Sequence, residues 1–219
     1  MALDWAVNIY MKFVQFDANY FNKSSKGDCV IRALCLATGY GYKKICDLLG
    51  VNFLPGIGYG WAKSQGISFD ELMDFAKKTK LIKPIEEEID WDFVDFLKGN
   101  GPKDDMMDVG SGFSLEDTID NNLIPDEREY RRLVVLLHSQ KNLKDLHAVC
   151  VDNHTKTYYD TSANESAKYG IVYAIFAADM NKIPSQKDPD YYSNEKARIL
   201  KSHADYLKNL KHKWAGITE

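Results

Sequence analysis

Three residues that are far apart in the sequence have the side chains that thiol-based acyl transfer requires. Cys29 follows Asp28, an expected N-cap, at the start of a predicted helix. Unpaired backbone N–H groups and the positive end of the helix dipole favour the thiolate at such a position. His147 begins a predicted strand, and Asp160 lies on the next one. The three could supply a nucleophile, a base and a carboxylate that orients the imidazole.

The pairing of His147 with Asp160 follows from hairpin geometry. If the turn at 153–156 is centred on His154 and Thr155, Val149 faces Asp160 across the hairpin. Asp160 then lies on the same face as His147, about 7–8 Å away as a diagonal neighbour, a gap that side chains can close. Asp152 points to the opposite face and is the weaker candidate.

The other cysteines and the glycines indicate structural roles. Cys35, Cys46 and Cys150 lie within apolar helical or strand patterns, which predicts that they are core residues. No Cys-x-x-Cys or His-x-x-x-His pair has the spacing of a zinc site. The glycine-rich segment 56–60 lacks the Lys-Ser/Thr of a phosphate-binding loop. We therefore expect no metal and no cofactor.

The elements that must position these residues can be predicted from capping signals and periodicity. Gly39 and Gly50 are expected to end two helices, and Ser68 with Glu71 forms a capping box that opens a third. Helices are expected at 28–38, 42–49, 69–79, 91–98, from 114 to about 123, and at 193–214. Buried strands are expected at 133–138, 146–152, 157–161 and 171–178. Helices followed by an antiparallel sheet predict an α+β fold.

Composition and charge narrow the class of protein. The chain has 219 residues, 45% of them hydrophobic, and a net charge of -4, which is typical of a globular protein. No segment is basic enough to predict nucleic-acid binding, and the longest apolar run, 171–178, is too short to span a membrane. Without a signal-like N-terminus, the four cysteines predict reduced thiols in a cytosol-like compartment. The segment 86–129 is strongly acidic and is expected to be a solvated, partly mobile insert.

At the candidate residues the sequence resembles the papain-like cysteine peptidase superfamily. The resemblance rests on Gly27–Leu34, on His147–Val151 and on Tyr159–Thr161, and it covers roughly residues 20–178. The closest likeness is to small bacteriophage-encoded members; related patterns occur in bacteriocin-processing peptidases and bacterial cell-wall endopeptidases. The resemblance implies that Cys29 is the nucleophile, His147 the base and Asp160 the orienting residue. It also implies a central helix packed on a sheet.

Some features depart from that pattern. The superfamily often has a Gln before the nucleophile that helps to bind the oxyanion. Lys23 stands near that position here, so the neighbouring Asn22 is the candidate oxyanion donor. The expected organisation is a papain-like domain over 1–183, followed by a linker and an amphipathic C-terminal helix over 184–219.

The function expected from these residues is hydrolysis or transfer at a peptide or amide bond of a peptide or protein substrate. The triad order does not separate peptidases from amidases or transglutaminases. The alternative is a non-catalytic bacteriophage virion or assembly protein on the same scaffold, which would bind a partner through the C-terminal helix. The expected location is the cytoplasm of the host cell or the virion.

Overall fold

A computed structural model gives the arrangement of the chain. It describes residues 11–15, 27–51, 53–54, 58–59, 66–100, 112–120, 130–160 and 165–182. Asn22 and the predicted C-terminal helix at 193–214 lie outside these residues. Within the described part the fold is α+β, with one mixed six-stranded sheet and a separate two-stranded one.

The six-stranded sheet has the order β1-β7-β6-β5-β8-β4. Its four central strands match the prediction closely: they are β5 (Arg132–His138), β6 (Leu146–Asp152), β7 (Thr157–Asp160) and β8 (Ile171–Ala178). The pairs among them are antiparallel, as expected. Long apolar runs form these strands because both faces of the sheet are covered.

Of the two edge strands, β1 corrects the expectation of a purely antiparallel sheet. β1 (Lys12–Gln15) pairs with β7 in parallel, whereas β4 (Ile82–Pro84), also unpredicted, pairs with β8 in the antiparallel direction. Two parallel strands such as β1 and β7 cannot be joined by a tight hairpin, so no turn signal in the sequence predicts β1. β4 is short and ends in Pro84, which suits an edge strand because proline has no N–H to donate.

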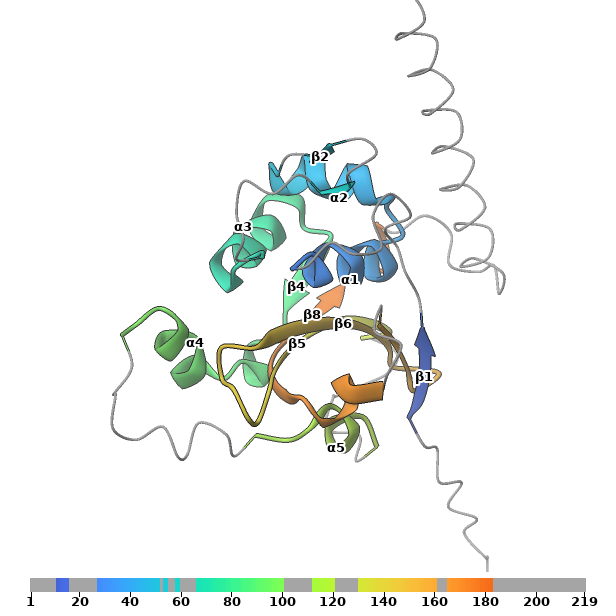
Figure 1. Cartoon of the computed structure of the whole chain (residues 1–219). Helices are drawn as coiled ribbons and strands as arrows, with labels where there is room; N and C mark the ends of the chain where they lie inside the picture. Colours follow the sequence, from blue (N-terminus) through green and yellow to red (C-terminus); the bar gives the residue numbers. More distant parts are fainter. Residues whose placement is uncertain are drawn as a thin grey trace, which may run out of the picture.

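Helices cover both faces of the sheet. Figure 1 shows α1 (Cys29–Thr38), α2 (Tyr42–Leu49) and α3 (Phe69–Thr79) on one side and α5 (Leu115–Asp120) on the other. Val134, Leu136, Ala148 and Cys150 join the core under α1, whereas the alternate strand residues join the core under α5. The period-two alternation of the strands therefore separates two apolar cores.

The ends of the first three helices confirm their sequence signals. Gly39 and Gly50 end α1 and α2 in the left-handed conformation, with φ of 70° and 71°. The capping box at Ser68 and Glu71 is present at the start of α3. These ends fix the length of α1 and the direction in which α3 begins.

Part of the acidic segment is packed against the core and is not solvated as expected, and the two helices that the sequence predicts there are present. It contains a 3-10 turn, η1 (Glu86–Glu88), and α4 (Trp91–Leu97), whose Phe93 and Val94 are fully buried. In α5, Leu115 and Ile119 are likewise buried. Apolar side chains spaced along one helix face are enough to anchor these short helices in the core, although about half of the residues around them are acidic.

The remaining short elements were not predicted. β2 (Phe53–Leu54) and β3 (Gly58–Tyr59) pair as a small antiparallel sheet in the glycine-rich region. A second 3-10 turn, η2 (Glu165–Tyr169), lies between β7 and β8 and contacts α5. Within the described residues, no helix has both the length and the apolar character needed to cross a membrane.

Candidate active site

Cys29 is the first residue of α1 and differs from the other cysteines. Its side chain is partly exposed, whereas Cys35, Cys46 and Cys150 are buried, as the sequence predicts. Burial also raises the pKa of Cys150 to about 12. The first turn of α1 contains no acidic residue, so the positive end of the helix dipole is not neutralised from within the helix. Cys29 is therefore the cysteine placed to act as a nucleophile.

Asp28 occupies the N-cap position, but its side chain does not cap the helix. It accepts a hydrogen bond of 2.7 Å from Arg32 Nε and one of 2.8 Å from the Tyr42 hydroxyl, and all three residues are buried. Arg32 lies one turn further along α1, and Tyr42 begins α2. Burial raises the pKa of Tyr42, which keeps its hydroxyl protonated as a donor. This corrects the capping prediction: Asp28 fastens the start of α1 to α2.

His147 and Asp160 meet as the hairpin geometry predicts. Cys150 lies opposite Tyr159, and Asp152 lies opposite Thr157, which is the register expected from a turn at His154 and Thr155. The Nε2 atom of His147 lies 2.9 Å from Oδ1 of Asp160. Asp160 is buried, whereas about a third of the His147 side chain is exposed, at 34%. The contact leaves the other ring nitrogen, Nδ1, for a second partner.

The pKa of His147 is affected by both of its candidate partners, Asp160 and Cys29. Burial lowers the pKa of His147, but hydrogen bonding and charge interactions with Asp160 and Cys29 outweigh that effect and raise the pKa to about 10. The imidazole is therefore protonated at neutral pH. A carboxylate on one side and a sulfur on the other stabilise this imidazolium.

Asp152, the weaker candidate, has a structural role. Its Oδ1 accepts hydrogen bonds of 3.1 Å from the backbone N–H groups of His154 and Thr155. These bonds stabilise the turn that sets the register of β6 and β7. Asp152 is thus confirmed as pointing away from His147.

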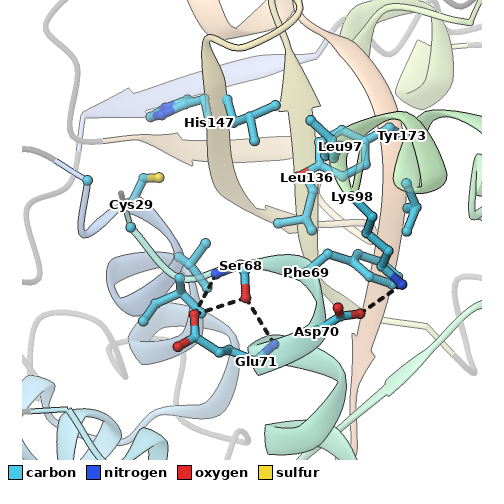
Figure 2. A pocket seen from close by; sticks show the side chains of 16 residues that line it. Cys29, Ser68, Phe69, Asp70, Glu71, Leu97, Lys98, Leu136, His147 and Tyr173 are labelled. Carbon is cyan, nitrogen blue, oxygen red and sulfur yellow. Dashed lines mark hydrogen bonds and ion pairs between the residues drawn. The ribbon is translucent and has the colours of Figure 1, made fainter. Parts of the chain in front are cut away.

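Cys29 and His147 line one cavity of about 820 Å³. Figure 2 shows the sulfur of Cys29 and the ring of His147 at the same end of this pocket, with Phe69 and Lys98 at the other. The start of α3 forms part of the wall, where Ser68 and Glu71 are held together by the capping box. The pocket is therefore large enough to admit a peptide side chain beside the thiol.

The structure brings together three of the four predicted site residues. Cys29 and His147 share the pocket, and Asp160 lies behind His147. Asn22 lies outside the described residues, so its role as oxyanion donor remains a prediction. The sequence reasoning missed the pocket walls, which include Val94, Leu97 and Tyr173. The capping box could have placed the start of α3, but no local signal indicates that α4 reaches this pocket.

Among the residues that the structure describes, no group of three or more His, Cys, Asp or Glu side chains could hold a metal ion.

Comparisons with known proteins give no further guide to the site. No protein-family model, no curated protein and no solved structure matches this chain.

Proposed function

We propose that the protein is a cysteine peptidase, or a related thiol acyl-transfer hydrolase, that acts on a peptide or amide bond through Cys29, His147 and Asp160. One observation carries the proposal: His147 contacts a buried carboxylate and lines the same cavity as a partly exposed thiol at a helix start. A papain-like arrangement of a central helix and a sheet, in a bacteriophage-encoded member, is part of the same proposal. The α+β architecture, with α1 packed on β6, is compatible with it.

The reaction would proceed in two steps. In the first, the Cys29 sulfur bonds to the carbonyl carbon of the substrate, and the bond from that carbon to nitrogen breaks. The imidazolium of His147 gives its proton to the departing amine. In the second step the neutral imidazole takes a proton from water, and the oxygen of that water displaces the sulfur from the thioester. The carboxylic acid leaves with the remaining hydroxyl of that water, and the Cys29 thiolate and the His147 imidazolium are restored.

Asp160 and the raised pKa of His147 have defined parts in this scheme. The carboxylate holds the ring in one orientation and stabilises the imidazolium. With a pKa of about 10, His147 carries its proton before the substrate arrives. It can therefore protonate the leaving amine without first taking a proton from elsewhere.

Two experiments on the full chain test the proposal. Iodoacetamide at neutral pH, followed by peptide mapping, should label Cys29 well before Cys35, Cys46 and Cys150, because the latter three are buried. Cys29→Ala should abolish cleavage of a native substrate and the trapping of a thioester, while the free energy of unfolding changes by no more than about 0.5 kcal/mol.

The non-catalytic alternative predicts different results. A virion or assembly protein would keep its partner binding in Cys29→Ala and lose it when the chain is truncated at Pro189. Equal labelling of all four cysteines in the folded protein would also contradict the enzymatic proposal.

A further inference from the structure

The cavity beside Cys29 has an apolar floor built by four elements. Val94 of α4, Leu136 of β5, Tyr173 of β8 and Phe69 of α3 line it and are exposed by only 0%, 2%, 5% and 8%. Leu97, the last residue of α4, adds a half-buried side chain. A side chain that enters this cavity from the Cys29 end meets hydrocarbon on several sides, which favours an apolar group.

The acidic and basic side chains around the cavity already have partners within it. Lys98 lies 3.0 Å from Asp70, and its ammonium also stands 6.0 Å from the centre of the Phe69 ring. Glu71 accepts hydrogen bonds from the backbone N–H and the hydroxyl of Ser68. A charged substrate side chain would have to displace one of these contacts or lose its hydration without compensation.

A second hollow lies beside His147. Its volume is about 520 Å³, and its lining includes His147 and Asp160, with polar residues such as Gln140 and Lys141. Of the two cavities, only the apolar one is lined by Cys29. The acyl part of the substrate is bonded to the Cys29 sulfur in the thioester, so it belongs in the cavity that contains the sulfur.

On the basis of the proposed function, we infer that this cavity selects a large apolar side chain on the acyl side of the scissile bond. We further infer that Leu97 of α4 is a specificity-determining residue. Leu97 is the one apolar wall residue of α4 that is not fully buried, and it precedes Lys98, whose ion pair with Asp70 crosses from α4 to α3. The side chain at 97 can therefore be changed without opening the hydrophobic core.

The test uses N-acetyl dipeptidyl chloromethyl ketones on the full chain. The Cys29 sulfur displaces chloride from such a probe and forms a C–S bond, and the rate is followed by intact-protein mass spectrometry. Each of the two residues is Leu, Phe, Glu or Lys in turn. At the position that enters the cavity, Leu and Phe should label Cys29 at least about tenfold faster than Glu and Lys.

Variants of Leu97 test its role. Leu97→Lys should slow the Leu probe about tenfold and accelerate the Glu probe, and Leu97→Ala should weaken the preference without reversing it. Asp95→Ala is the matched control, because Asp95 lies on the same helix, is exposed and does not line the cavity. This variant should prefer apolar over charged probes to the same extent as the original protein. Circular dichroism checks that each variant is folded.

Iodoacetamide separates this inference from the proposed function. It carries no side chain, so its rate reports only the reactivity of Cys29. If iodoacetamide labels Cys29 but the peptidyl probes show no apolar preference, or Leu97→Lys leaves the preference unchanged, the inference is overturned and the proposed function stands. If neither reagent labels Cys29 selectively, both fail.

Discussion

Replacement of Asp160 by Asn is the sharpest test of how the candidate site is built. The amide oxygen of Asn can still accept a hydrogen bond from Nε2 of His147, so the variant removes the charge and keeps the geometry. The interaction at 2.9 Å is one of the effects that raise the pKa of His147 from 6.5 to about 10. An opposite charge at such a distance changes a pKa by about 1–3 pH units. Asp160→Asn should therefore lower the pKa of His147 by that amount.

The measurement is an NMR titration of the imidazole signals. The chain has five histidines, and the signal that disappears in His147→Gln identifies His147. His138 provides an internal contrast because burial lowers its pKa, so its midpoint should fall below 6.5 while that of His147 lies near 10. Asp152→Asn is the control, since that carboxylate caps the turn and does not touch His147.

The raised pKa of His147 also predicts how the free energy of unfolding depends on pH, and Asp160→Asn tests this. A folded-state pKa above the unfolded value means that His147 contributes stability fully below pH 6.5, and that this contribution is lost as pH rises to about 10. The advantage of the original protein over Asp160→Asn should thus shrink across that window. An unchanged His147 midpoint in Asp160→Asn, or an original midpoint near 6.5, would refute the reasoning.

Two further predictions concern the elements that position the site. Asp28→Asn removes the carboxylate that binds the buried Arg32, so the free energy of unfolding in urea should fall by about 3–5 kcal/mol. The control is Asp74→Asn, at an exposed position, which should change the free energy of unfolding by less than about 0.5 kcal/mol. Equal stability of the two variants would count against the buried ion pair. Ser68→Ala removes the hydroxyl that accepts from the Glu71 N–H and should cost about 1 kcal/mol, and no change in the urea midpoint would contradict the capping role.

Much of the fold could be predicted because its signals are local. The helix ends at Gly39 and Gly50 and the capping box at Ser68 depend on residues within one turn of each other. The β6–β7 register depends on a short turn, and it was sufficient to bring Asp160 to His147. Local rules thus located the two groups that matter most for the proposed chemistry.

The features that were missed depend on contacts between distant segments. Asp28 has the sequence of a cap, but its carboxylate turns to Tyr42, which is fourteen residues away. The parallel partner of β1 and the place of α4 in the pocket wall depend on packing that no neighbouring residues reveal. The walls of the pocket could therefore not be predicted from the sequence, although the contact between His147 and Asp160 could.

The position of His147 at the end of the sheet explains how it can serve both partners. By strand alternation it belongs with Val149 and Val151, on the face covered by α5, whereas Cys29 lies over the face that carries Ala148 and Cys150. Deeper in the sheet, the strands would separate the imidazole from the thiol. As the second residue of β6, His147 lines the cavity on each side of the sheet, so one ring nitrogen meets Asp160 while the other is left for Cys29. The site must therefore lie where the strand begins, and the partial exposure of His147 is a consequence of that position.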